Sequence, residues 1–187
     1  MKRIVAFAAL AFAVSAFAQQ PPVPPAPPAR APAPARQLIA DAQKAAAKDG
    51  RKVMVIFHAS WCGWCHKFEG FMDQPQFKPL FAKSYAIVRL DVLENDDKKN
   101  LENPGGMDVM NELGGANQGI PYFAVLDGKG KAIVNSKRPS DRVKGGENIG
   151  HPAAPEEIAH FMSVLKTTSK MNADELAKIE AWLKNQK

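Results

Sequence analysis

The strongest constraint on this chain is a pair of cysteines, two residues apart, that follows an apolar run. Cys62 and Cys65 are the only cysteines among the 187 residues, and they come shortly after the apolar residues 53–57. A Cys-x-x-Cys pair at the end of a strand can open and close a disulfide. Together with His66 it also matches Cys-x-x-Cys-His, the attachment signature of c-type haem. The first question is whether these sulfurs carry out thiol–disulfide exchange or bind a haem covalently.

The N-terminus has the pattern of a secretory signal. Residues 1–18 combine a positive start at Lys2 and Arg3, an apolar core over 4–14, and Ala-Phe-Ala at 16–18 as the cleavage pattern. The apolar part is shorter than the roughly 20 residues of a membrane-spanning helix, which favours cleavage over an uncleaved anchor. We therefore expect a periplasmic or extracellular protein, in a compartment where disulfides persist. Cytochromes of the c type are assembled there as well, so export does not separate the two chemistries.

The rest of the chain divides into a linker and one domain. Residues 19–36 are rich in proline and alanine, which predicts a disordered, extended linker. Residues 37–187 fit one compact domain by length, and we expect a monomer. The formal net charge is +6, but the lysines are spread along the chain and not gathered into a block with aromatic residues. The sequence therefore gives no indication of a nucleic-acid partner.

Hydrophobic periodicity predicts an α/β domain. Helical patterns are predicted over 38–48, from Cys62 to the break at Gln74-Pro75, and over 77–83, 155–165 and 173–183. Apolar runs predict strands over 53–59, 85–92, 122–126 and 131–135, the last two forming an antiparallel hairpin around 127–130. Residues 93–119 read as a loop with a short helix near 107–113. This order suits a mixed sheet with helices on both faces.

The spacing of the two cysteines suits thiol–disulfide exchange. At the first turn of a helix, the Cys62 thiolate would be stabilised by unpaired backbone N–H groups and by the helix dipole, making it the attacking nucleophile. Cys65, one turn further, would resolve the mixed disulfide. A purely structural bridge is a weak alternative because so short a loop restricts the unfolded chain little. On this interpretation the only cofactor is the redox-active Cys62–Cys65 disulfide.

Two motifs identify a family resemblance. The strand followed by Trp61-Cys62-Gly63-Trp64-Cys65, and the downstream Gly119-Ile120-Pro121, resemble the thioredoxin superfamily over about residues 37–167. The resemblance extends to the C-terminal thioredoxin-like domain of transmembrane disulfide reductants. It implies a central mixed sheet flanked by helices, here with an extra C-terminal helix. It also implies that Pro121 is cis and lies against the cysteines, and that Ile120 offers its backbone to a bound substrate strand.

The chain also departs from thioredoxin near the site. Ile56 stands where thioredoxin has a buried aspartate, so the usual proton acceptor for the second cysteine is missing. Glu69 resembles an acidic residue of the reductant domain and is a candidate substitute, the alternative being a solvated helix glutamate. Trp64 replaces the proline between thioredoxin's cysteines, and Trp61 is expected to shield the disulfide and offer an apolar docking surface. His58, which interrupts the first strand, is expected to be a hydrogen-bonded core histidine.

Two further segments are longer or less regular than in thioredoxin. Residues 93–119 are a candidate rim over the site, since loops commonly carry specificity. The segment 146–152, with His151, looks like a feature of exported thioredoxin-like proteins, but the sequence assigns it no role.

These observations predict an exported thiol–disulfide oxidoreductase with Cys62 as nucleophile and Cys65 as resolving thiol. In family terms, Gly63 after the first cysteine and Ile120 before Pro121 favour a reductant of exported client proteins, which needs a membrane-bound thiol reductant as electron donor. A disulfide oxidase or isomerase of the same fold is an alternative.

Alternatives from other classes are a c-type haem protein and a non-catalytic thioredoxin-like binding module. In the haem protein His66 would be an axial ligand, with Met107, Met110 or His151 as the second. Against haem stand the buried strand that leads into the cysteine pair and the Gly-Ile-Pro turn, for which a cytochrome has no need. No metal site is expected, because a closed zinc site needs four ligands and none of the four histidines has a paired spacing.

Overall fold

The computed structural model describes residues 31–186. The predicted signal over 1–18 and most of the predicted linker over 19–36 lie outside these residues. Within the described part, no helix combines the length and apolar character needed to cross a membrane.

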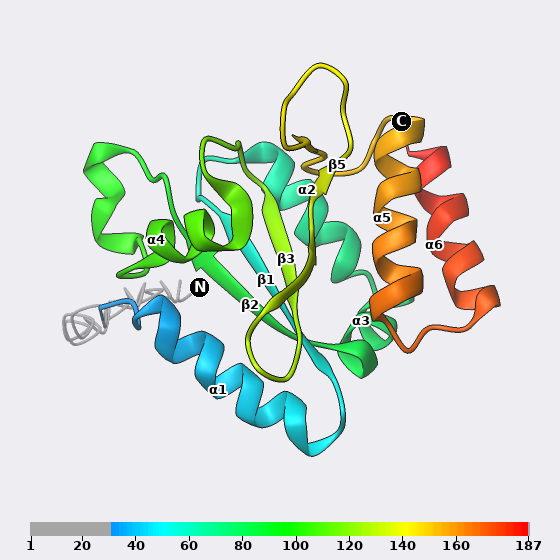
Figure 1. The fold of residues 1–187 in the computed structure, drawn as a ribbon, viewed down its shortest axis with the longest axis horizontal. Coiled ribbons are helices and arrows are strands. Elements are labelled where there is room, and N and C mark those ends of the chain that lie inside the picture. The colour runs from blue at the N-terminus through cyan, green and yellow to red at the C-terminus, as the bar shows by residue number, and fades with distance from the viewer. Residues whose placement is uncertain (1–30, 187) are drawn as a thin grey trace, which may run out of the picture. The chain divides into compact units, whose positions relative to one another are not determined.

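A mixed four-stranded sheet forms the centre of the domain, in the order β2-β1-β3-β4 (Figure 1). β1 (Lys52–His58) pairs in parallel with β2 (Tyr85–Asp91) and antiparallel with β3 (Tyr122–Leu126). β3 pairs antiparallel with β4 (Ala132–Asn135), as predicted for a hairpin. Because β1 is central and covered on both faces, its residues 53–57 are all apolar and all buried.

Helices cover both faces of the sheet (Figure 1). Val53, Val55 and Phe57 pack on one face with residues of α1 (Ala35–Lys48) and α4 (Gly106–Met110). Met54 and Ile56 pack on the other face with residues of α2 (Gly63–Met72), α3 (Lys78–Ser84), α5 (Pro155–Thr168) and α6 (Ala173–Asn185). The predicted α/β class, with flanking helices and an extra C-terminal helix, is confirmed.

α1 begins earlier than the sequence pattern predicted. It starts at Ala35 and not at residue 38, with Pro34 as its N-cap. The Ala35 side chain is fully buried, and its N–H donates to the Pro104 carbonyl over 2.9 Å. Residues 35 and 36 therefore belong to the folded domain and not to the linker. The helix can begin directly after Pro34 because proline is well tolerated where a helix begins.

α6 is anchored at its start and along one side. The Asn172 side chain caps it by accepting a hydrogen bond from the Glu175 N–H over 2.9 Å, and the Glu175 carboxylate accepts one from the Asn172 N–H. Ile179 and Leu183 are buried, and the Trp182 ring stacks on Phe71 with 4.8 Å between centroids. The C-terminal helix is therefore part of the main core.

The two irregular regions carry structure that the sequence pattern did not predict. Residues 93–119 contain the 3₁₀ helix η1 (Asp96–Leu101) before α4, and a π-helical turn, Asn111–Gly115, after it. The polar stretch after β4 contains a small antiparallel pair, β5 (Lys137–Arg138) with β6 (Glu147–Asn148). Strands of two residues leave no periodic pattern, which explains why they were read as loop.

Candidate active site

The two cysteines lie where β1 runs into α2, and they form a disulfide. Cys62 is the N-cap of α2, and its sulfur accepts the Cys65 N–H over 3.1 Å. The two differ in access, since Cys62 is 4 % exposed and Cys65 is fully buried. An N–H donor and the positive end of the helix dipole at Cys62 both stabilise a thiolate there.

The segment around Pro121 lies against the disulfide. The Ile120–Pro121 peptide bond is cis. The Ile120 carbonyl oxygen is 3.6 Å from the Cys62 sulfur, and the Ile120 side chain packs against the small buried cluster formed by Ala59 and the two cysteines. The structure therefore brings the Gly-Ile-Pro motif, found 58 residues further along the chain, into direct contact with the reactive sulfur.

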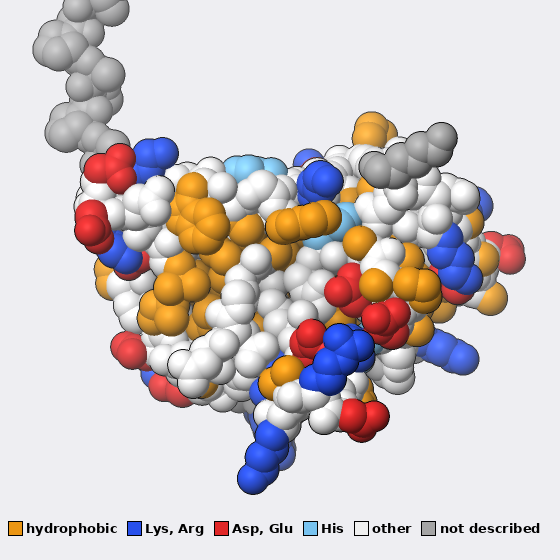
Figure 2. All heavy atoms as spheres, turned by 90° about the horizontal axis from the view of Figure 1, so that it is seen from above, with side chains coloured by type: hydrophobic (Ala, Val, Ile, Leu, Met, Phe, Trp, Pro, Cys, Tyr) orange, Lys and Arg blue, Asp and Glu red, His pale blue; other side chains and the backbone are white. Residues whose placement is uncertain are grey.

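A half-exposed tryptophan directly precedes each cysteine. Trp61 is 51 % exposed, and its indole N–H donates to the Leu93 carbonyl over 2.7 Å. Trp64 is 54 % exposed, stacks on the buried His151 with 5.9 Å between centroids, and lies under the Lys67 ammonium. Figure 2, which views the molecule from the end where β1 meets α2, shows hydrophobic side chains gathered on this face. Such exposed aromatic rings are typical of surfaces that bind other proteins.

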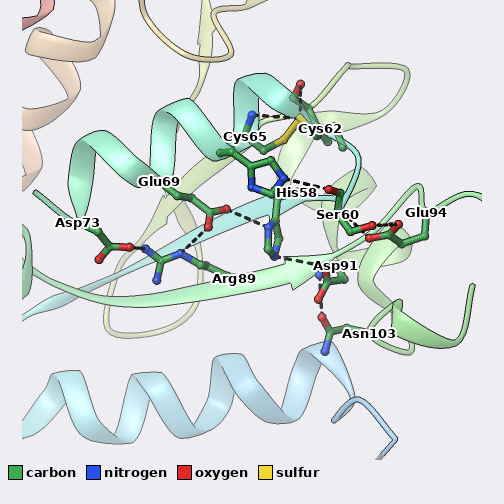
Figure 3. Close-up of polar contacts among 12 residues, drawn as sticks. His58, Ser60, Cys62, Cys65, Glu69, Asp73, Arg89, Asp91, Glu94 and Asn103 are labelled. Atoms are coloured by element: carbon green, nitrogen blue, oxygen red, sulfur yellow. Dashed lines mark hydrogen bonds and ion pairs between the residues drawn. A yellow bond between two sulfur atoms is a disulfide. The ribbon is translucent and has the colours of Figure 1, made fainter. Parts of the chain in front are cut away.

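Glu69 lies in a cluster of charged side chains below the cysteines (Figure 3). Its carboxylate is 2.9 Å from His58 Nδ1 and 3.1 Å from Arg89 Nε. His58 Nε2 is also 3.5 Å from Asp91, and Arg89 donates to Asp73 over 2.9 Å. Glu69 Oε1 and Arg89 Nε have no well-aligned hydrogen bond, so Glu69 and Arg89 form an ion pair, and Glu69 and His58 form one when His58 is protonated. Glu69 is thus a part-buried ion-pair partner and not a solvated helix glutamate.

The ion pairs change the acid–base properties of the cluster. Burial lowers the pKa of His58, but the contact with Glu69 and the charge of Asp91 outweigh burial, so the pKa is raised. Burial raises the pKa of Glu69, but His58 and Arg89 outweigh it, so the pKa of that carboxyl is lowered. A carboxylate with a lowered pKa is a weaker base. Its described contacts also go to His58 and Arg89 and not to Cys65, so this geometry gives no support to Glu69 as the proton acceptor for Cys65.

Glu94 supports the site, although no sequence pattern indicated it. It is 3 % exposed, and its carboxylate accepts the Ser60 N–H over 2.5 Å and the Ser60 hydroxyl over 2.8 Å (Figure 3). With the neighbouring bond from Trp61 to Leu93, it fixes the turn that precedes Cys62. Glu94 opens a run of charged residues that reads as solvated loop, and it lies 34 residues from its partner. No local pattern could have linked the two.

A groove of about 500 Å³ lies next to the site, and its lining includes Trp64, which stands between the cysteines, and Ile120, whose carbonyl oxygen approaches the Cys62 sulfur. Trp64 forms one side, residues 118–121 form a second, and residues 147–151 form a third. The segment to which the sequence assigned no role is therefore a wall of the site. The arrangement provides a cysteine sulfur at a helix N-terminus, where its anion is stabilised, and an open groove that shares Trp64 and Ile120 with the surroundings of that sulfur.

Comparison with known families agrees with this geometry. The model of the thioredoxin-like family matches residues 35–128, just over half of the chain. The chain therefore belongs to the thioredoxin-like family.

Relatives with similar sequences are disulfide-exchange proteins by name. A protein disulfide-isomerase of Hordeum vulgare is 31 % identical over 119 residues, which cover 60 % of this chain and 20 % of that protein. The thiol:disulfide interchange protein DsbD of Haemophilus ducreyi is 31 % identical over 94 residues, which cover 50 % of this chain and 15 % of that protein. The matched part thus spans about a fifth or less of these curated relatives. Among solved structures, a disulphide isomerase from Xylella fastidiosa Temecula1 has a TM-score of 0.49 at 21 % identity, covering 83 % of this chain and 95 % of that one.

Proposed function

We propose that this protein is an exported thiol–disulfide oxidoreductase that reduces disulfides of exported client proteins. The observation that carries the proposal is the different setting of the two sulfurs. Cys62, the N-cap of α2, keeps a small exposed fraction of 4 % and lies against Ile120 of the groove wall, whereas Cys65 is fully buried one turn further along. This is the arrangement expected of an attacking thiol and a resolving thiol.

The proposed reaction has two exchange steps. In the reduced protein, the Cys62 thiolate attacks one sulfur of a client disulfide, forms a mixed disulfide and expels the other client sulfur as a thiolate. Cys65 then loses its proton to water and attacks the Cys62 sulfur, which closes the disulfide and releases the second client thiolate. Two electrons pass to the client, whose thiolates take up two protons. No cofactor is needed beyond the disulfide itself.

The direction of transfer rests on family likeness. Gly63 and Ile120 are the residues that favour a reductant, and DsbD is among the relatives. A membrane-bound thiol reductant would then recharge the protein, and we expect it to act as a monomer. The names of other relatives keep an isomerase as the alternative.

The reduction potential of the exported protein tests the direction. The full chain would be expressed with its signal, purified, equilibrated in dithiothreitol or glutathione buffers and followed by tryptophan fluorescence. A value near the roughly −270 mV of thioredoxin supports a reductant, and one near the roughly −120 mV of strong oxidants reverses the direction. A Soret band in the same sample would identify a haem protein instead.

The roles of the two cysteines give a first prediction. Cys65→Ser should accumulate mixed disulfides with client proteins, because the resolving step is lost, and Cys62→Ser should accumulate none. Non-reducing gels of exported extracts, with and without dithiothreitol, measure this. Partners retained equally by a variant lacking both cysteines would indicate a binding module and contradict the proposed exchange.

A further inference from the structure

Asn148, in the segment to which the sequence assigned no role, is fully hydrogen-bonded at the edge of the groove. Its side-chain N–H groups donate to the carbonyls of Gly119, over 2.8 Å, and Pro121, over 3.0 Å. Its side-chain oxygen accepts from the Ser136 hydroxyl over 2.7 Å and from the Gly150 N–H over 3.2 Å. Both donors and both acceptor sites of the amide are thus in use.

The two carbonyls held by Asn148 lie on either side of Ile120. Ile120 is the residue whose carbonyl oxygen lies 3.6 Å from the Cys62 sulfur. The backbone N–H of Asn148 also donates to the Gln118 side chain over 3.2 Å, which adds a third connection to the same loop. Three hydrogen bonds from Asn148 therefore hold Ile120 in its position next to the Cys62 sulfur.

The residue behind Asn148 is buried and bonded to the central sheet. Ser136 is fully buried, and its hydroxyl accepts the Phe123 N–H of β3 over 3.2 Å. The Ser136 carbonyl also accepts the Ile149 N–H over 2.9 Å. A continuous path of hydrogen bonds thus runs from the central sheet through Asn148 to the loop at the sulfur. Among residues of this size only a carboxamide fits, because aspartate has no N–H to donate and alanine has neither group.

We propose that Asn148 is a positioning residue for disulfide exchange, holding the Ile120 backbone in register with Cys62 while a client segment lies in the groove. This inference rests on the proposed function. A large client that must align along residues 118–121 depends on the position of the Ile120 backbone relative to the Cys62 sulfur. A small disulfide that meets only the Cys62 sulfur does not.

The test compares two oxidants of the reduced protein. Insulin serves as the protein disulfide and 5,5′-dithiobis(2-nitrobenzoate) as the small one, with rates followed against concentration. We expect Asn148→Ala to lower kcat/KM for insulin about tenfold, mainly by raising KM, with less than a twofold change for the small disulfide. Asn135→Ala is the matched control, since this part-buried asparagine bonds Leu113 and Lys137 and not residues 118–121.

Asn148→Asp is the second variant. It keeps the shape and the acceptor but lacks both donors, so it carries the test if Asn148→Ala does not fold. Unchanged insulin kinetics in an active protein, or a parallel loss with both oxidants, would overturn the positioning role and leave the proposed function intact. A wild-type protein that reacts with neither oxidant would overturn both.

Discussion

At the scale of single residues, the ionisable side chain of β1 beneath the cysteines stands at a different position from the buried aspartate of thioredoxin. Ile56 occupies the position of thioredoxin's buried aspartate, and the nearest ionisable residue on the same face of β1 is His58, two residues closer to Cys62. Its partners Glu69 and Asp91 come from α2 and β2, and Arg89 of β2 pairs with Glu69. The charges compensate one another within the cluster. Proton removal from Cys65 is therefore assigned to water in the proposed reaction.

The His58–Glu69 pair predicts how stability depends on pH. His58 has a raised pKa in the folded state, so its contribution is fully present below the unfolded value of about 6.5 and is lost as pH rises through the folded value. Glu69 has a lowered pKa, so its contribution is present above about 4.5 and is lost as pH falls through the folded value. The pair should stabilise the fold most between these two pH values.

Urea unfolding of the oxidised protein at pH 5.5 and pH 8.5 measures this effect. We expect the free energy of unfolding to fall between the two conditions in the wild type and to fall less in His58→Gln. The charges of Arg89, Asp91 and His66 also act on this pair. The change of unfolding free energy with pH is therefore a property of the whole cluster. His160→Gln, on α5 and outside the cluster, is the control. Equal slopes in His58→Gln and wild type would contradict the assignment.

The bond between Ser60 and Glu94 gives a second prediction at this scale. A double-mutant cycle with Ser60→Ala and Glu94→Gln should show a coupling of about 1.5 kcal/mol, the lower end for a hydrogen bond to a charged group, because Ser60 is exposed. Equilibrium unfolding of the four proteins gives the value. A coupling near zero would mean that the Ser60 hydroxyl bond does not contribute, and that Glu94 holds the turn only through the Ser60 backbone N–H, which Ser60→Ala leaves in place.

At the scale of elements, the sequence predicted what is long or local. β1 and α5 were predicted because continuous burial and helical periodicity extend over many residues. The cysteine pair was predicted because its chemistry lies within four residues. The start of α1 was missed because Pro34 and Ala35 share the composition of the linker. Glu94 and Asn148 were missed because folding alone brings them to residues about 30 positions away.

The docking of α6 is testable with a matched pair of leucines. Leu183→Ala removes a side chain that is 1 % exposed in the main core, and should cost about 2–5 kcal/mol of unfolding free energy. Leu101→Ala, at a position 39 % exposed, should cost less than about 0.5 kcal/mol. Urea denaturation of both variants measures the difference. Similar small losses would show that α6 contributes little to the core.

At the scale of the whole molecule, the chain assembles its site at one end of the sheet. α2, the 93–94 segment, residues 118–121 and residues 147–151 each supply a contact around the disulfide. The helix pair α5 and α6 packs on the same face of the sheet as α2 (Figure 1). The reactive end is thus built by the second half of the chain as much as by the cysteine motif.

The proposed export predicts a processed protein. Mass spectrometry of protein from the exported fraction should find Gln19 as the first residue, and a variant lacking residues 2–18 should stay in the cytoplasm. An unprocessed chain in the membrane fraction would show that residues 1–18 act as an anchor instead.

The limited access to Cys62 has a kinetic consequence. Cys62 is only 4 % exposed as a residue, so its sulfur is a small target for freely diffusing thiols, whereas a partner bound in the neighbouring groove would stay near it for many attempts. Exchange with docked partners should then outrun exchange with the surrounding solution. If the proposed exchange holds, the oxidation state of the protein would be set by its docked partners and would lag behind the redox potential of the medium.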